Sequence, residues 1–211
     1  MSIAAEHDLG PWERRRIHTS LEIECAALAQ IVEHGLDSVT VEQIADAAGI
    51  STRTFFRYFK NVRDVLTAVT VRETERLCVL VRARPKDEPL LDAFRAVYKD
   101  FAAIDLGIQD TDQEDAELKS TSLAYWGRIV QRDPEAGRSL GHVTEVMTER
   151  FSAVIRERLD LPEEDFITAG VLAAALAGAV WFAYVHWLQL DTTASLGTYL
   201  DSAFDCLAAL G

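Results

Sequence analysis

The segment from Thr40 to Asp64 constrains this chain most, because it reads as two short amphipathic helices on either side of a tight turn. Thr40 and Gln43 have the spacing of a capping box, and apolar residues then recur at helical spacing as far as Ala48. Gly49 suits the position that ends a helix with a positive φ, and Ser51 suits the N-cap of the helix that follows. The pattern therefore predicts a helix–turn–helix.

The second of these helices has two different faces. Phe55 and Phe59 lie four residues apart, so they share one face, which we expect to be buried in a core. Arg53 and Arg57 have the same spacing on another face, which we expect to point outward. The helix therefore combines an apolar anchor with an exposed pair of guanidinium groups.

The charge of this segment differs from that of the whole chain, whose 21 Lys and Arg against 34 Asp and Glu give a formal net charge of -13. Residues 47–63 contain no acidic residue, and they contain Arg53, Arg57, Lys60 and Arg63. A basic segment in an acidic chain favours a polyanionic partner, because neutralised phosphates release counterions, and helix–turn–helix geometry suits the DNA major groove. The alternative is a helical pair whose basic face is only solvated.

This part of the chain resembles the DNA-binding region of the TetR family of bacterial transcriptional regulators. The resemblance covers about residues 14–68, and four stretches carry it: an Ala-rich helix that ends in His34-Gly35, then TVEQIA at 40–45, AGIS at 48–51 and RTFFRYF at 53–59. It implies an all-α regulator, most often a repressor, with a DNA-binding head and a body that binds a small molecule. Val62 stands where the family usually has a lysine that meets a phosphate, so Lys60 or Arg63 would have to substitute.

The residues and the resemblance together predict the DNA contacts. Arg53 and Arg57 are expected to read base edges, because arginine pairs best with guanine O6 and N7. Arg14 and Arg15 crowd the N-terminal end of the first helix, which is unfavourable for cations, so a phosphate would relieve them; a solvated cluster is the alternative. Contacts to the backbone or to base edges are further expected from Thr40, Gln43, Ser51, Thr52, Thr54, Phe56, Tyr58, Lys60 and Arg63, with Phe56 in the place of a frequent family tyrosine.

Apolar residues recur at helical spacing over most of the chain and predict an all-α fold of about nine helices, without strands or repeats. We expect a DNA-binding domain over residues 1–66, including the start of the fourth helix, and a helical regulatory and dimerisation domain over 67–211. The first part carries 7 basic and 10 acidic residues (net -3), which leaves 14 and 24 (net -10) for the second. Later helices are expected to start at Pro134, Pro162 and Asp191.

The segment 166–190 contains no charged residue and is long enough to cross a bilayer, but acidic residues flank it on both sides, which argues against a membrane helix. A helix that is apolar all round must be covered on all sides. Because a single helix–turn–helix seldom binds tightly, we expect a homodimer through the last two helices. The predicted interface residues are Ala169, Ala173, Ala177, Val180, Tyr184, Leu200 and Phe204, and the alternative is that they form intramolecular core.

The resemblance also implies a small-molecule site in the second part of the chain. The residues predicted to line it are Phe94, Tyr98, Phe101, Trp126, His142, Trp181 and Phe182, although aromatic residues at helical spacing also suit a plain core. Arginines in this part are scattered, so no basic cluster is set to receive an anion. An apolar effector is therefore expected.

Other function classes find little support in the sequence. The five histidines lack metal-ligand spacing, and neither a Gly-rich phosphate loop nor a nucleophile elbow occurs, so we expect no enzyme, cofactor or metal site. Cys25, Cys78 and Cys206 are far apart, and the first ten residues contain no apolar run, which suits a reducing cytoplasm. The rival interpretation is a helical interaction module whose basic segment binds an acidic protein.

Overall fold

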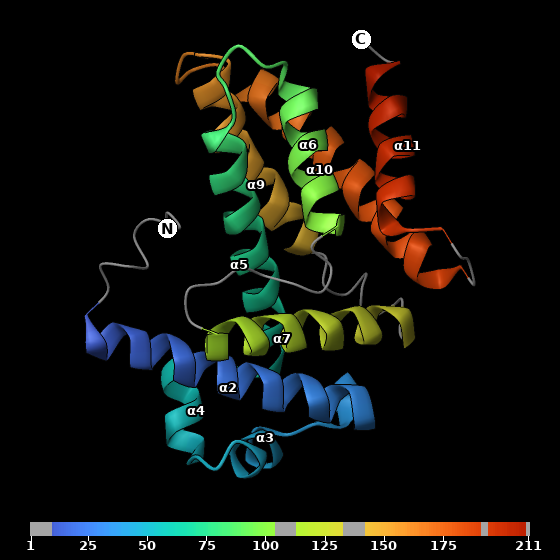
Figure 1. The fold of residues 1–211 in the computed structure, drawn as a ribbon. Helices are drawn as coiled ribbons and strands as arrows, with labels where there is room; N and C mark the ends of the chain where they lie inside the picture. Colours follow the sequence, from blue (N-terminus) through green and yellow to red (C-terminus); the bar gives the residue numbers. More distant parts are fainter. Residues whose placement is uncertain (1–9, 104–112, 133–141, 191–193, 210–211) are drawn as a thin grey trace. The chain divides into compact units, whose positions relative to one another are not determined.

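The structure, a computed structural model, describes residues 10–103, 113–132, 142–190 and 194–209, and they are helical with no strand among them (Figure 1). This confirms the predicted all-α fold. The helices are α2 (Pro11–His34), the short 3-10 helix η1 (Leu36–Ser38), α3 (Val41–Ala47), α4 (Thr52–Tyr58), α5 (Val62–Ala83), α6 (Leu90–Ala103), α7 (Gln113–Arg132), α9 (His142–Arg158), α10 (Phe166–Gln189) and α11 (Leu196–Ala208).

The helices group into two compact units. The first unit contains α2, η1, α3, α4, the beginning of α5 up to Val69, and α7; we call it the head unit. The second contains α5 from Thr70 onward with α6, α9, α10 and α11, and we call it the body unit. Helix α5 is continuous through both. The functional division predicted between residues 66 and 67 stays a prediction.

Helix α7 belongs to the head unit, although the sequence analysis placed it in the regulatory part. It lies alongside α2 (Figure 1), and its residues bond to that helix. The Cys25 thiol donates to the Leu118 carbonyl at 3.2 Å, and the His18 ring lies 2.7 Å from the Asp115 carboxylate. Arg132 donates to the carbonyl of Val32 at 2.6 Å. These partners are about a hundred residues apart in the sequence, so no local pattern announces them.

The core of the head unit consists of the apolar residues that recur at helical spacing. Ile44 of α3 and Phe55 of α4 are fully buried, together with Leu28 of α2 and Leu66 of α5. Phe59, just beyond α4, packs on Phe55 with ring centroids 5.7 Å apart. The expected anchoring face of α4 is thus confirmed, and it fixes the opposite face toward solvent.

In the body unit, α10 packs on α9 and α11, and α11 packs also on α6. The Phe94 and Phe151 rings make an edge contact with centroids 5.0 Å apart, and Tyr98 lies 5.9 Å from Phe204. Helix α10 begins at Phe166, later than the predicted Pro162, because the Asp165 side chain caps it by accepting the Thr168 N–H at 3.2 Å. The helix starts predicted at Pro134 and Asp191 lie outside the described residues.

The residues predicted for a dimer interface need correction. Ala169, Ala173 and Ala177 of α10 are fully buried inside the body unit, Val180, Leu200 and Phe204 are 6% exposed or less, and Tyr184 is half-buried. These side chains pack within one chain, as the alternative interpretation held. The opposite face of α10 remains exposed and apolar, with Ile167 64%, Val171 62% and Phe182 63% exposed.

By length and composition alone, α10 would also suit a membrane span. A helix in the core of a soluble protein has the same composition, and one face of α10 is packed in this way against α9 and α11. The opposite face, with Ile167, Val171 and Phe182, is not covered in this way.

Candidate nucleic-acid interface

The first helix of the helix–turn–helix is fixed by its N-terminal cap. The backbone N–H of Thr40 donates to Oε1 of Gln43 at 2.8 Å, and the N–H of Gln43 donates to Oγ1 of Thr40 at 3.3 Å. This reciprocal pair is the predicted capping box, and it satisfies two N–H groups that α3 itself cannot. Both side chains are exposed, so the cap holds them at the surface of the head unit.

The turn between α3 and α4 is closed by Gly49, whose φ is +65°. The N–H of Ile50 donates to the Ala45 carbonyl at 2.9 Å, and the N–H of Gly49 donates to the Asp46 carbonyl at 3.1 Å. This pair of bonds is a Schellman motif, in which a left-handed residue ends the helix and satisfies its last carbonyls. The turn thus fixes the direction in which α4 leaves α3.

Helix α4 begins at a second cap. Ser51 accepts the N–H of Thr54 at 3.1 Å, and the two hydroxyl groups lie 2.9 Å apart. Thr52 and Thr54 are half-buried at the start of the helix. The hydroxyl groups of Ser51, Thr52 and Thr54 thus lie at the N-terminal end of α4, where the partial positive charge of a helix favours anions.

The outward face of α4 carries Arg53, Phe56 and Arg57. All three are exposed, and Phe56 is 57% exposed although it is a large apolar residue. The Arg57 guanidinium lies 5.1 Å from the centre of the Tyr58 ring and donates to its hydroxyl at 3.3 Å. Arg53, Arg57 and the Phe56 ring therefore form one exposed face of α4. The burial of Phe55 on the other side of the helix keeps this face toward solvent.

Arg63 has an intramolecular partner that the sequence analysis missed. It donates to the Asp37 carboxylate at 2.8 Å, and the two residues are 26 positions apart, which local spacing cannot reveal. Lys60 is exposed, and its backbone N–H donates to the Asp64 carboxylate at 2.9 Å. Val62, the first residue of α5, is half-buried. Of the two proposed substitutes for the family lysine, only the Lys60 side chain lacks a carboxylate partner among the described residues.

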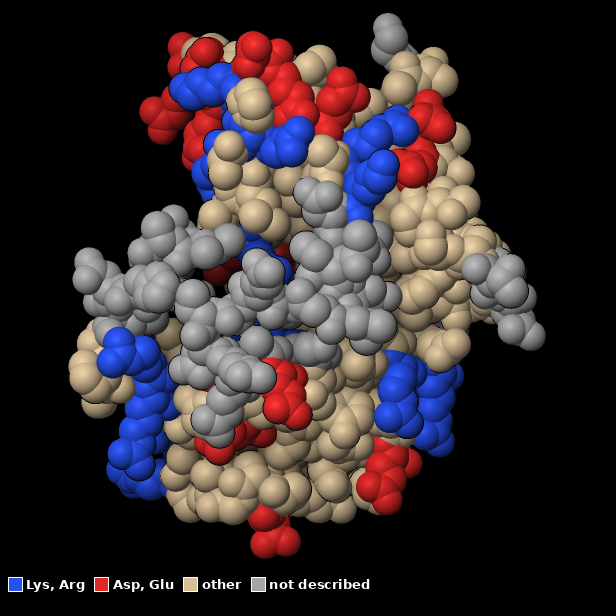
Figure 2. Space-filling model, viewed as in Figure 1, with Lys and Arg blue, Asp and Glu red and all other residues tan. Residues whose placement is uncertain are grey.

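Arg14, Arg15 and Arg16 are exposed in the second turn of α2. Lys and Arg side chains gather along the edge of the head unit over the beginning of α2 and over α4 (Figure 2). The structure therefore presents the predicted basic residues on one unit, as a binding surface for a polyanion would require.

The residues predicted for a small-molecule site do not share one environment. Phe94 and Tyr98 are buried on α6, and Trp181 is half-buried on α10. Phe182 is exposed and stacks on His186 with ring centroids 4.0 Å apart, so it does not line the interior of the body unit. Trp126 is buried on α7, in the head unit. The side chains of Phe101 and His142 lie outside the described part of the structure.

The buried face of α5 contains polar residues that the sequence analysis did not select. Thr70, Glu73 and Thr74 are 8%, 8% and 3% exposed, and they are followed on the same face by the apolar Leu77 and Cys78. The Arg72 guanidinium donates to the Glu73 carboxylate at 3.1 Å. Burying polar groups is costly unless they find partners, so this interruption of an apolar face is a candidate for ligand recognition.

Comparisons with known proteins agree with this geometry. A family model for bacterial regulatory proteins of the tetR family matches residues 25–69, which span the helix–turn–helix. The chain is 28% identical over 196 residues to a Mycobacterium tuberculosis protein named as a mycofactocin biosynthesis transcriptional regulator, MftR, which covers 93% of this chain and 92% of the relative. It is 27% identical over 200 residues to the HTH-type transcriptional regulator TcmR of Streptomyces glaucescens, covering 92% and 85%.

Solved structures show the same fold. The fatty acid degradation regulator FadR of Bacillus halodurans superimposes with a TM-score of 0.56 at 16% identity, over 94% of this chain and 95% of that one. SmeT, the repressor of a multidrug efflux pump in Stenotrophomonas maltophilia, gives 0.57 at 19% identity, over 90% and 89%. The helix–turn–helix thus lies in the segment that matches the tetR family, and the relatives that this chain resembles over most of its length are transcriptional regulators.

Proposed function

We propose that this protein is a ligand-responsive repressor that binds a pseudo-palindromic operator as a homodimer. The observation that carries the proposal is the exposed face of α4, where Arg53, Phe56 and Arg57 project from a helix anchored by Phe55. Arginine donates two hydrogen bonds to guanine in the major groove, and an exposed ring can contact a sugar or a thymine methyl group. Thr40 and Gln43 at the α3 cap and Lys60 are exposed, and in this proposal they meet phosphates.

The homodimer is supported by the exposed apolar face of α10. Ile167, Val171 and Phe182 lie at spacings of four and eleven residues, so they share one side of the helix, and Gly178 lies between them. A second copy of the same helix would cover this face, since a symmetric dimer brings the same patch of both subunits together. Two heads would then read two half-sites about one helical turn apart.

An effector site is proposed inside the body unit. Phe94 and Tyr98 on α6 supply the apolar part, and the buried polar face of α5 supplies hydrogen-bonding groups at Thr70 and Glu73. An effector with an apolar body and one polar group fits these residues better than a wholly apolar one. If effector binding releases DNA, DNA must weaken effector binding by the same factor.

The remaining parts of the proposal follow from this role. The relatives MftR and TcmR are transcriptional regulators, and we propose that this chain likewise acts on DNA in the cytoplasm, outside the membrane, without enzymatic activity or a cofactor. Its effector would be a small molecule from the same compartment.

The test begins with a random duplex pool at near-physiological salt, from which the retained duplexes are sequenced. The expected result is an inverted repeat with half-sites about one helical turn apart. Arg53→Ala should weaken binding by about 1–3 kcal/mol and relax the preference at one position of each half-site. Arg128→Ala on α7 removes another exposed arginine and serves as the matched control.

Two outcomes would count against the proposal. An unchanged affinity and an unchanged sequence preference in Arg53→Ala would show that α4 does not read bases. Failure of the wild-type chain to enrich any symmetric duplex would favour the rival function, an interaction module for an acidic protein, and a pull-down would then follow.

A further inference from the structure

Helix α5 occupies a special place in the chain, because its first turns belong to the head unit and the rest belongs to the body unit. Val65, Leu66 and Val69 contribute to the buried apolar residues of the head unit, and Leu77, Cys78 and Val81 contribute to those of the body unit. A continuous helix transmits a displacement of one end to the other. The attachment of its C-terminal end therefore matters for the head at its N-terminal end.

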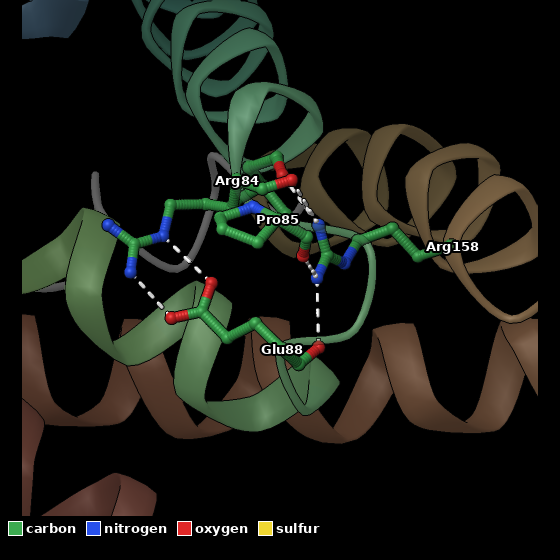
Figure 3. A network of polar contacts seen from close by, with 5 residues as sticks. Arg84, Pro85, Glu88 and Arg158 are labelled. Atoms are coloured by element: carbon green, nitrogen blue, oxygen red, sulfur yellow. Dashed lines mark hydrogen bonds and ion pairs between the residues drawn. The ribbon is translucent and has the colours of Figure 1, made fainter.

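That end is bound by one side chain from α9. The Arg158 guanidinium donates to four backbone carbonyls (Figure 3): Nη1 to Val81 at 3.1 Å and to Arg84 at 3.2 Å, and Nη2 to Pro85 at 2.7 Å and to Glu88 at 2.9 Å. The acceptors extend from the last turn of α5 to the residues just before α6. The Arg158 guanidinium, at the end of α9, thus connects the C-terminal end of α5 with the segment that leads into α6.

The physical reason for this arrangement is the shortage of donors at a helix C-terminus. The last carbonyls of a helix have no intrahelical N–H partner, and the partial negative charge there favours a cation. Arginine is suited to the task because its planar fork presents five donors in fixed directions, whereas lysine is a point charge on a flexible stem. The geometry of Arg158 is therefore specific to arginine.

Neighbouring ion pairs hold the same region. Arg82 of α5 donates to both carboxylate oxygens of Glu157 at 2.7 and 3.1 Å, and this hydrogen bond lowers the pKa of Glu157. Arg84 pairs with Glu88, whose carbonyl Arg158 binds (Figure 3). Farther along, Arg150 lies 3.3 Å from Glu75. Helix α5 is thus tied to α9 near its middle and at its end, with the densest bonding at Arg158.

We propose that Arg158 is a positioning residue for DNA binding: by fixing the C-terminal end of α5 to α9, it sets how each body holds its head for simultaneous contact with two half-sites. The inference rests on the proposed function, since it concerns a dimer on a two-fold operator. It predicts that losing this attachment affects binding to a whole operator and spares binding to a half-site, because a half-site needs only one correctly folded head.

The experiment compares Arg158→Gln and Arg158→Lys with wild type, using full-length protein and the operator recovered from the random pool. Each protein is titrated by fluorescence anisotropy against the whole operator and against a duplex with one intact half-site. Arg158→Gln should weaken whole-operator binding about tenfold and leave half-site binding within about twofold. Arg158→Lys should restore the affinity only in part, because it keeps the charge without the fork.

The matched control is Arg156→Gln, which removes the same charge from the same helix two residues away. Arg156 is half-buried, and unlike Arg158 its guanidinium binds none of the carbonyls between α5 and α6. It should leave the ratio of whole-operator to half-site affinity unchanged. An equal loss on both duplexes in Arg158→Gln, no loss on either, or the same change in the control would overturn the proposal.

A second measurement needs no variant and covers the case in which Arg158→Gln does not fold. Hydrogen exchange of wild type is followed with and without the operator at the amides of Arg84 and Glu88, whose N–H groups donate to Val81 and Pro85. Slower exchange with the operator would support the coupling, and unchanged rates would overturn it. Failure of the proposed function would show itself differently, because no symmetric operator would be recovered in the first place.

Discussion

At the scale of single residues, the ion pair between Arg63 and Asp37 means that Asp37 competes with a DNA phosphate for the Arg63 guanidinium. The two groups are exposed and 2.8 Å apart, so a phosphate that binds Arg63 must displace a carboxylate. Arg63 and Lys60 are the two cations that we expect to replace the family's usual lysine, in whose place Val62 stands. The carboxylate of Asp37 is thus expected to weaken DNA binding.

We therefore predict that Asp37→Asn strengthens operator binding severalfold, by about 0.5–1 kcal/mol, because it frees Arg63 and removes a negative charge near DNA. Anisotropy titrations at several salt concentrations would measure the affinity and its salt slope. Glu33→Gln removes a charge elsewhere in the head unit and controls for the general effect. An equal gain in both variants would show that the Arg63 pair is unimportant.

The cysteines also differ in environment at this scale. Cys78 is buried, and its burial raises the pKa of the thiol from 9.0 to about 11, while Cys206 is exposed. The unfolded thiol therefore ionises at a lower pH than the folded one. The contribution of the Cys78 thiol to the free energy of unfolding is therefore fully present below about pH 9, and it is lost as the pH rises toward 11.

We predict that this loss approaches roughly 2–3 kcal/mol above pH 11, since each unit of pKa corresponds to about 1.4 kcal/mol. Urea unfolding of wild type and of Cys78→Val at several values from pH 8 to above pH 11 would measure this loss as the difference between the two proteins. Thiol labelling should modify Cys206 rapidly and Cys78 only when the chain opens. Rapid labelling of Cys78 in the native protein would contradict the assignment.

At the scale of elements, the turn between α3 and α4 depends on one backbone conformation. Gly49 has a φ of +65°, and a Cβ built there meets no atom within 4 Å, so a side chain would fit sterically around the residue. The cost of a substitution comes from the backbone itself, because L-residues other than Asn and Asp disfavour this region.

Gly49→Ala should accordingly destabilise the chain by about 1–2 kcal/mol and weaken DNA binding, while Gly49→Asn should cost less. Chemical unfolding of the two variants and of wild type would give the order. If alanine and asparagine cost the same, the left-handed conformation would not be the cause of the destabilisation.

At the scale of the whole molecule, the exposed face of α10 is expected to decide the oligomeric state. Val171→Glu places a charge in the middle of this face, and Phe182→Glu places another at a spacing of eleven residues. Burying a charge without a partner is costly, so the variants should dissociate at concentrations at which wild type is a dimer, with at least about a tenfold rise in the dissociation constant.

Analytical ultracentrifugation over a range of concentrations would measure the effect. Lys99→Glu, at an exposed site on α6, introduces the same side chain away from α10 and should leave the dimer intact. Variants of α10 that remain dimeric would place the subunit contact on a different surface. If wild type sediments as a monomer, the proposed dimer interface on α10 is wrong.

The helix–turn–helix, its caps and the exposed face of α4 follow from the order of the amino acids alone. Each of these depends on residues within four positions of one another: Thr40 with Gln43, Ser51 with Thr54, and Phe55 with Phe59. Hydrogen bonds and apolar spacing over one helical turn are local, so the amino-acid order specifies them. For this reason the helix–turn–helix is predictable from the sequence nearly residue by residue, whereas the place of α7 in the head unit is not.

Three other features depend on how the helices pack: the buried side of α10, the position of α7 against α2, and the bonds from Arg158 to the end of α5. A helix that is apolar all round has no periodicity to mark its inner face, so Ala169 and Val171 look alike in the sequence although one is buried and the other exposed. The contacts of α7 with α2 and of Arg158 with the end of α5 join residues 70 or more positions apart. Such contacts arise from packing, and no local pattern encodes them.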